Sequence, residues 1–185
     1  MDLVTLTTER LMLRPWRLGD VEAASAYAND EAWSRYLPVP FPYTFQHGEE
    51  FVARAVLSNW DTHPLWAVTL NGLAVGGIDL HVRSEDNVAS IGYSLAQAHW
   101  GKGLTAEGAR AAIGWAFDAF ELEKVSATAD LLNTQSWRVM EKLGMQREGV
   151  LRSDRILRGR RMDVVHYGIL KSEWVGSLKA CLLYT

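Results

Sequence analysis

The segment between residues 88 and 129 constrains the fold more than any other part of the chain. An apolar strand-like run, "VASIGYSL", precedes a helix-like run, "TAEGARAAIGWAFDAF", and a second strand-like run, "KVSATA", follows. The pattern then continues with a helix, "NTQSWRVMEKLG", and two strands, "QREGVLR" and "MDVVHYGIL". The second half of the chain is therefore predicted to fold as β-α-β-α-β.

The first half has more hairpin character. The strands "LWAVTL" and "LAVGGIDLHV" are joined by Asn71-Gly72, a dipeptide suited to the positive φ angles of a tight turn. A strand, "RLMLRPW", precedes a helix, "LGDVEAASAYAND", which Asp20 is expected to cap. Residues 33–45 contain three prolines and are expected to form an ordered loop before a helix, "GEEFVARAVLSNW". Together these patterns predict an α/β (α+β) fold with a mixed, largely antiparallel sheet covered by helices.

Composition limits the classes of partner and compartment. With 185 residues and 48% hydrophobic content, the chain is expected to form one domain over residues 1–172, with residues 173–185 as a C-terminal tail. A net charge of −3 gives no general attraction to nucleic acid or to a membrane surface. The single cysteine, Cys181, and the lack of a signal-peptide pattern indicate a cytoplasmic protein. The five histidines show no metal-site spacing, so no metal is expected.

The decapeptide "HWGKGLTAEG" places two glycines and a lysine directly before a helix. The first N–H groups of a helix have no intrahelical partner, and the helix dipole adds positive potential there. Gly101 and Gly103 allow the backbone to approach a ligand closely, and Lys102 adds a cation. These features suit a phosphate group, although an ordinary helix start explains them equally well.

Two known phosphate-binding motifs have glycine patterns similar to this segment. The Walker motif is absent, because Lys102 is followed by Gly103 and not by Ser or Thr. The dinucleotide pattern G-x-G-x-x-A is met by Gly101, Gly103 and Ala106, with Asp130 at the end of a later strand. However, "LAQAHW" separates the strand from the first glycine, where a dinucleotide turn is tight. A nucleotide-binding oxidoreductase therefore remains only the alternative function.

A second group of polar residues lies in "NTQSWRVMEKLGM". Asn133 follows a strand and is expected to cap the next helix, which places Ser136 in the first helical turn. Gly144 is suited to end that helix. Helix formation does not require both polar side chains. They follow the end of a strand, where α/β units usually place ligands, so both are candidate ligand-binding residues.

These segments resemble the GNAT acetyltransferase superfamily, and within it the ribosomal-protein N-acetyltransferase branch of the RimJ/RimL type. The resemblance covers nearly the whole chain: "TERLMLRPWRLGDVEAA", "GGIDLHV", "ASIGYSLAQAHWGKGLTAEG", "NTQSWRVMEKLGMQREG" and "MDVVHYGIL". It implies a seven-stranded sheet splayed between the fourth and fifth strands, with acetyl-CoA as cosubstrate in the opening. It also implies transfer of the acetyl group to a primary amine; a coenzyme-A-binding sensor without turnover is the other alternative.

The resemblance assigns roles to particular residues. Backbone groups of Tyr93, Ser94 and Leu95 would bind the pantetheine arm and the thioester carbonyl. Asn133 would contact the cofactor arm, and Ser136 would act on the leaving sulfur. The pyrophosphate loop here reads "AHWGKG", so Ala98 replaces a residue that is usually polar in the family. The loop residues that would bind the pyrophosphate are Gly101, Lys102, Gly103, Leu104, Thr105 and Ala106.

A general base is harder to assign. Members of this branch often carry a glutamate after the serine helix, and in "LRSDRIL" that position is occupied by Arg155. Asp154 is adjacent, and Asp79 and Glu107 are further carboxylates expected near the cleft. The missing glutamate favours an acceptor amine of low pKa, such as a protein N-terminus or an amino-acid-like small molecule.

Two surfaces are candidates for acceptor binding. Trp33, Tyr36 and Tyr43, in an aromatic segment, would line an acceptor cavity or else cover the core. The stretch "RSDRILRGRR", which contains Arg155, would attract an anionic acceptor or else form a solvated hairpin tip around Gly159. The oligomeric state is left open by the sequence, with a homodimer among the alternatives.

Overall fold

The computed structural model describes residues 1–174, and the chain divides into two compact units. The first unit contains residues 1–81 and 92–112, and the second contains residues 82–91 and the chain from Ile113 onward. Strands β4 (Leu73–Arg83) and β5 (Val88–Leu95) contribute residues to both units. Residues 1–172, predicted to form one domain, are thus divided between these two units.

The first unit contains an antiparallel sheet. Its strands are β1 (Leu6–Thr7), β2 (Met12–Pro15), β3 (Leu65–Leu70) and most of β4, each paired antiparallel to the next. The β3–β4 turn has positive φ angles at Asn71 (51°) and Gly72 (84°), as predicted for this dipeptide. β1, which is two residues long, was not predicted from the sequence.

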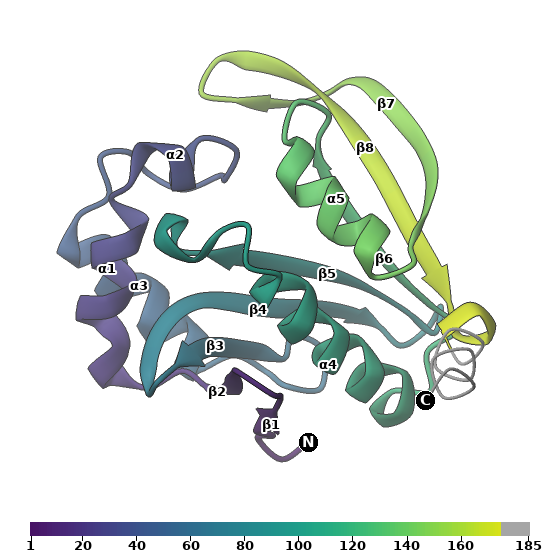
Figure 1. Ribbon diagram of the computed structural model, residues 1–185, viewed down its shortest axis with the longest axis horizontal. Coiled ribbons are helices and arrows are strands. Elements are labelled where there is room, and N and C mark those ends of the chain that lie inside the picture. The colour runs from purple at the N-terminus through teal and green to yellow at the C-terminus, as the bar shows by residue number, and fades with distance from the viewer. Residues whose placement is uncertain (175–185) are drawn as a thin grey trace. The chain divides into compact units, whose positions relative to one another are not determined.

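Helices in the first unit follow the predicted order with different boundaries. The expected loop over residues 33–45 begins inside a short helix and ends at the start of α3, which Thr44 caps by accepting from the His47 N–H. Figure 1 shows α1 and α3 side by side. The helical elements are η1 (Leu18–Asp20), α1 (Val21–Ala28), α2 (Glu31–Ser34), α3 (Phe45–Val56), η2 (Gln97–His99) and the beginning of α4 (Leu104–Ala119).

Alternation along the strands places different residues on the two faces of this sheet. On one face, a Cβ added to Gly108 of α4 would lie 3.0 Å from Ile78 and 3.5 Å from Leu13, so a glycine lets this helix pack closely. On the other face, Trp16 packs edge-on against Phe51 of α3, with ring centroids 5.0 Å apart. The core of this unit therefore lies on both faces of the sheet.

Asp20 has a different role from the one predicted. Its side chain makes no capping hydrogen bond to α1. Instead, its two oxygens accept from the Arg14 guanidinium at 2.7 Å each, and Oδ2 also accepts from the Arg17 N–H at 2.9 Å. Both Arg14 and Asp20 are buried. Asp20 pairs with Arg14 because burying its charge without a partner would cost more free energy than a hydrogen bond that caps α1 contributes.

Along the chain, β5, α4, β6, α5 and β7 follow the expected β-α-β-α-β order, and the second unit contains part of β5, the end of α4 and all later elements. Residues Val88–Ser90 of β5 pair in parallel with Lys124–Ser126 of β6. β8 pairs antiparallel with both β6 and β7. The elements are β6 (Lys124–Asp130), α5 (Thr134–Lys142), β7 (Gln146–Leu157) and β8 (Arg160–Leu170).

The hydrogen-bonded strand order is β1-β2-β3-β4-β5-β6-β8-β7. The mixed, largely antiparallel sheet with flanking helices is as predicted, but it has eight strands and not seven. The additional strand is β1, which pairs with β2 through Leu6–Leu13 and Thr7–Met12.

The packed part of the chain extends into the predicted tail. Trp174 is buried and its ring lies 5.9 Å from that of Phe117, while Glu173 accepts from the Gln146 side-chain amide. The remainder of the predicted tail, residues 175–185, lies outside the described residues. Among residues 1–174, none of the helices combines the length and apolar character needed to span a bilayer.

Candidate functional site

The glycine-containing loop before α4 has a conformation that requires glycine. Gly101 and Gly103 have φ angles of 75° and 77°, in the left-handed region that other residues rarely adopt. A Cβ at Gly101 would meet nothing within 4 Å, and one at Gly103 would lie 3.7 Å from Arg10 Nη2. Glycine is therefore required here by backbone conformation and not by a lack of space.

The first turn of α4 presents unpaired backbone donors. The Glu107 N–H donates to the Gly103 carbonyl at 3.1 Å, which is the first hydrogen bond of the helix. The preceding N–H groups of Leu104, Thr105 and Ala106 thus have no intrahelical acceptor. Such donors, together with the helix dipole, favour an anionic ligand at this position.

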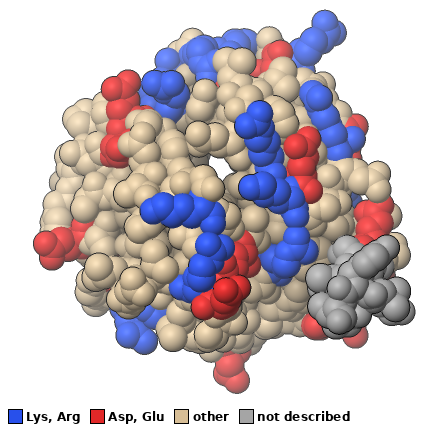
Figure 2. Space-filling view, in the orientation of Figure 1, with Lys and Arg blue, Asp and Glu red and all other residues tan. Residues whose placement is uncertain are grey.

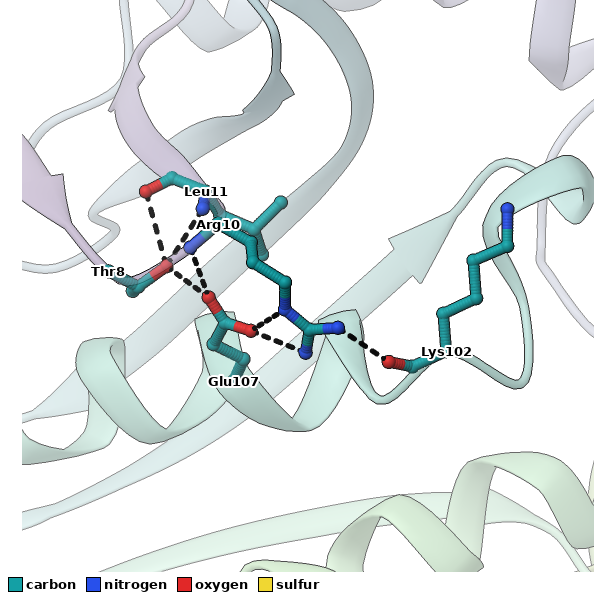
Figure 3. Close-up of polar contacts among 5 residues, drawn as sticks. All are labelled: Thr8, Arg10, Leu11, Lys102 and Glu107. Atoms are coloured by element: carbon teal, nitrogen blue, oxygen red, sulfur yellow. Dashed lines mark hydrogen bonds and ion pairs between the residues drawn. The ribbon is translucent and has the colours of Figure 1, made fainter.

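Glu107, in the first turn of α4, contacts the segment that precedes β2 (Figure 3). Its Oε1 accepts from Thr8 Oγ1 at 2.5 Å and from the Arg10 N–H at 2.9 Å, and its Oε2 pairs with Arg10 Nη2 at 2.6 Å. Burial acts to raise the pKa of Glu107, but the hydrogen bonds from Thr8 and Arg10 prevail and lower it. This carboxylate, which the sequence left as a candidate base, is engaged in holding the start of α4.

The same arginine also fastens the glycine loop. Arg10 Nη1 donates to the Lys102 carbonyl at 3.0 Å, and Figure 3 shows the Lys102 side chain extending away from this contact. The Lys102 ammonium donates to the Ala98 carbonyl at 2.9 Å. The predicted cation is therefore present at the loop, and the Lys102 side chain bends back toward the backbone that precedes the loop.

The end of β5 is packed closely against β4. A Cβ at Gly76 would lie 2.2 Å from the Ser94 carbonyl oxygen and 2.9 Å from the Leu95 Cα, so only glycine fits there. The Leu95 carbonyl accepts from Trp100 Nε1 at 2.5 Å, which links the strand end to the glycine loop. Tyr93, Ser94 and the loop residues 101–106 thus belong to one continuous structure in the first unit.

In the second unit, the turn between β6 and α5 is fixed by a buried carboxylate. Asp130 Oδ1 accepts from the Leu132 N–H at 2.9 Å, and Oδ2 pairs with Arg160 at 2.5 Å. The Asp130 side chain is only 1% exposed. The dinucleotide pattern relied on an acidic residue at this strand end, where it would bind the ribose, and the burial and pairing of Asp130 do not fit that role.

The turn places Asn133 and Ser136 as predicted. Asn133 caps α5, and its side-chain oxygen accepts from the Ser136 N–H at 3.3 Å. Ser136 is partly buried in the first turn of the helix. Gly144, with a φ of 82°, follows the helix end.

Asp154 and Arg155 are exposed residues of β7. Asp154 lies within an irregularity in the β7–β8 pairing, and Arg155 is the first paired residue after it. In the irregularity, Ser153 has a φ of 52° and its N–H donates to Asp163 at 2.8 Å. The hairpin tip has positive φ angles at Arg158 and Gly159, as expected for a turn. Figure 2 shows several Lys and Arg side chains exposed on one face of the molecule.

The aromatic candidates for acceptor binding differ in exposure. Tyr43 is buried, and its hydroxyl donates to the His47 carbonyl at 3.0 Å. Burial raises the pKa of Tyr43. Trp33 lies between Tyr27 and Tyr43, with ring centroids 5.4 and 6.5 Å away. Trp33 and Tyr36 are partly buried, so Tyr43 has the strongest role in packing among the three.

The first unit also contains a cluster of His63, Asp79 and His81, which was not predicted from the sequence. The two histidine Nε2 atoms lie 3.6 and 3.2 Å from Asp79 Oδ2. Burial acts to raise the pKa of Asp79, but both histidines lower it, to about 2, while Asp79 raises the pKa of His81. Only the i, i+2 spacing of Asp79 and His81 on one strand was visible in the sequence.

Known proteins resemble this chain over most of its length. Residues 10–146 match the family model described as "Acetyltransferase (GNAT) domain". The N-acetyltransferase p20 of Bacillus licheniformis is 30% identical over 176 residues, covering 93% of this chain and 99% of that protein. YdaF of Bacillus subtilis, named for a ribosomal N-acetyltransferase activity, is 36% identical over 107 residues, covering 57% of this chain and 58% of YdaF.

A solved structure supports the same relationship. The GNAT-family acetyltransferase of Bacillus anthracis is 28% identical, with a TM-score of 0.83 over 91% of this chain and 99% of that one. The largely antiparallel sheet also differs from the doubly wound parallel sheet of a dinucleotide-binding oxidoreductase, and no comparison supports that alternative or a sensor without turnover. The chain therefore belongs to the GNAT family and is an acetyl-CoA-dependent N-acetyltransferase.

Proposed function

We propose that this enzyme acetylates a primary amine of low pKa, either the N-terminal α-amine of a protein or peptide or the amine of an amino-acid-like small molecule. The observation that carries the cofactor part of the proposal is the start of α4. There, the N–H groups of residues 104–106 have no intrahelical acceptor, and the preceding loop has positive φ angles at Gly101 and Gly103. These groups would bind the pyrophosphate of acetyl-CoA.

The end of β5 would bind the reacting part of the cofactor. Backbone groups of Tyr93, Ser94 and Leu95 would hold the pantetheine arm and stabilise the oxyanion that forms on the thioester carbonyl. The Leu95 carbonyl already accepts from Trp100 Nε1, so N–H groups and the other carbonyls of this segment would make the contacts. Asn133 would contact the cofactor arm.

The reaction would proceed by direct attack of the neutral amine nitrogen on the thioester carbon. The carbon–sulfur bond then breaks, the amine loses a proton, and Ser136 donates a hydrogen bond or a proton to the departing sulfur. Asp154 would assist proton removal only modestly, because it is an exposed carboxylate on β7.

The choice of a low-pKa acceptor follows from ionisation. An α-amine with a pKa of about 7.7 to 8.0 is roughly 10 to 17% neutral at pH 7, whereas a lysine amine with a pKa of about 10.4 is only about 0.04% neutral. Arg155 occupies the position where the related branch often carries a glutamate, so a strong carboxylate base is absent from that position. The similarity to YdaF favours a protein acceptor of the type its name describes.

Acceptor contacts are proposed for Trp33, Tyr36, Tyr43 and Arg155. The partly buried Trp33 and Tyr36 offer aromatic surface, and Tyr43 packs edge-on against Trp33. Arg155 would attract the carboxylate of an amino-acid-like acceptor or an acidic side chain of a peptide. The single cysteine is consistent with action in the cytoplasm.

The test is a screen of acceptors by release of the coenzyme A thiol. The purified chain would be given acetyl-CoA with three sets of amines: peptides with free N-termini, the same peptides with blocked N-termini and one free lysine, and free amino acids. Turnover with the first or third set and not with the second is the expected result. Turnover only with the lysine peptides would contradict the proposal.

A further inference from the structure

The cluster of His63, Asp79 and His81 brings together three side chains that can donate an electron pair to a metal ion. One donor atom from each side chain lies within 4.8 Å of the other two. Asp79 and His81 are two residues apart on β4 and share a face of the strand. His63 comes from the segment before β3, which no sequence motif connects to them.

Backbone contacts hold the two segments together. The Leu80 N–H, between Asp79 and His81, donates to the Pro64 carbonyl at 2.9 Å. The His63 N–H donates to the Asn59 carbonyl at 2.6 Å. His63 is thus fixed beside β4 by its own backbone and by that of its neighbour.

Gly92 on β5 makes room for the carboxylate. A Cβ at this position would lie 2.6 Å from Asp79 Oδ1, so any other residue would displace the side chain. With Oδ1 lying against Gly92, Oδ2 faces both histidines. The carboxylate is therefore oriented by the backbone around it and not only by the two imidazoles.

The two distances from Asp79 Oδ2 to the histidine nitrogens are close to those between neighbouring ligand atoms of a metal ion. The His63 Nε2 to Asp79 Oδ2 distance of 3.6 Å exceeds the range of an N–H···O hydrogen bond, and the His81 distance of 3.2 Å is at its limit. Neighbouring ligand atoms in a tetrahedral zinc site lie about 3.3 to 3.5 Å apart, given bonds of about 2.0 to 2.2 Å. The two distances in the cluster lie on either side of this interval.

We propose that His63 Nε2, Asp79 Oδ2 and His81 Nε2 form a binding site for a divalent transition metal, with Zn²⁺ as the best-suited ion. Two imidazoles and one carboxylate favour zinc and its neighbours over Mg²⁺ or Ca²⁺, which prefer oxygen ligands. Three protein ligands leave at least one coordination position open. His81 and His63 side chains are 62% and 36% exposed, so an ion reaches the site from solvent.

Calorimetric titration of the untagged full chain with Zn²⁺ tests the site. Wild type and Cys181→Ser, which removes the only thiol, should each bind one Zn²⁺ per chain. Asp79→Asn and His81→Gln should each weaken that binding by at least about tenfold. His47→Gln is the matched control, because His47 is a histidine of the same unit outside the cluster, and it should bind Zn²⁺ as wild type does.

A second measurement separates coordination from misfolding. Co²⁺ bound to wild type should give the intense visible absorption of a four- or five-coordinate ion, and His81→Gln should abolish it while keeping the wild-type circular dichroism and Tm without metal. If Asp79→Asn unfolds, His63→Gln replaces it. The proposal is overturned if wild type binds no stoichiometric Zn²⁺, or if the folded cluster variants bind it as tightly as wild type, since that means adventitious surface binding only.

Discussion

Arg10 and Glu107 form an ion pair of 2.6 Å, and the same guanidinium donates to the Lys102 carbonyl at 3.0 Å. One side chain thus connects the segment before β2, the first turn of α4 and the glycine loop. Arg10 and Glu107 are 44% and 18% exposed, so the pair adds little to global stability in water. Its value lies in holding the loop and the helix start in one arrangement.

Replacing Arg10 by Gln should therefore affect the cofactor more than the fold. We expect the Kd for acetyl-CoA to rise at least about fivefold, equivalent to one hydrogen bond of about 1 kcal/mol, with little change in Tm. Arg83→Gln, which removes an exposed ion pair with Asp86, is the control and should leave the Kd unchanged. Equal cofactor affinity in Arg10→Gln and wild type would show that the loop does not depend on this contact.

The conformation of Gly103 gives a second prediction. Valine at this position is strained because φ is 77°, so Gly103→Val should weaken acetyl-CoA binding at least about tenfold while the protein remains folded. Gly72→Val is a matched control, since Gly72 has a φ of 84° in the β3–β4 turn. Gly72→Val should lower Tm by about as much as Gly103→Val does, but it should bind acetyl-CoA with wild-type affinity. Calorimetry and thermal unfolding of both variants distinguish strain from a lost binding site.

Ser136 is predicted to act on the leaving thiolate. Ser136→Ala should lower kcat by about 10- to 1000-fold, with acetyl-CoA affinity nearly unchanged, because the interaction forms as the carbon–sulfur bond breaks. Thr134→Ala, an exposed residue in the same helical turn, should keep wild-type kcat. Steady-state kinetics and a cofactor titration check both. Full activity in Ser136→Ala would leave this serine with only a structural role.

Asp154 is predicted to contribute modestly to proton removal. Asp154→Asn should keep at least about a tenth of the wild-type kcat/KM, whereas loss of a dedicated base commonly costs about 10²- to 10⁴-fold. The rate of both proteins should rise toward pH 8 as the acceptor amine loses its proton. pH–rate profiles with one amine of known pKa decide the matter. A thousandfold fall together with loss of the acidic limb would identify Asp154 as the base.

The buried Arg14–Asp20 pair predicts how stability depends on pH. Burial acts to raise the pKa of Asp20, but hydrogen bonds from Arg14 and the Arg17 N–H prevail and lower it. A carboxylate whose folded pKa is depressed stabilises the fold above its unfolded pKa, near 3.9, and this stability is lost as pH falls through the folded pKa. The free energy of unfolding should therefore decline as pH falls from about 5 toward 2.

Asp20→Asn tests the same pair. At pH 7 it should lower the free energy of unfolding by about 3 kcal/mol, because it leaves the Arg14 charge buried without its partner. The difference between variant and wild type should shrink at low pH, where wild-type Asp20 is itself protonated. Urea unfolding at pH 7, 5 and 3 gives the comparison. A difference that stays constant with pH would mean that Asp20 does not titrate with folding.

Local patterns determined most of the elements. Val88–Leu95 is a strand with the predicted limits, and Asn71-Gly72 forms the predicted turn. Asn133 caps α5 as its position after a strand indicated. These features depend on residues near one another in the chain, since backbone preference and side-chain capping act over a few positions. The order of such elements also carried the resemblance to the GNAT family, which the family model confirms.

Only the tertiary structure decided which residues far apart in the sequence contact one another. Asp20 looked like a helix cap, but burial beside Arg14 made an ion pair the better use of its charge. Glu107 was expected to be a carboxylate near the cleft, but folding brings it to Thr8 and Arg10, about a hundred positions earlier in the chain. His63 joins Asp79 and His81 because the Pro64 carbonyl pairs with the Leu80 N–H. The sequence by itself determined the family and most of the helices and strands, because local conformation and periodicity depend on neighbouring residues. Only the tertiary structure decided which charged side chains meet, because that choice depends on burial and on contacts between segments far apart in the chain.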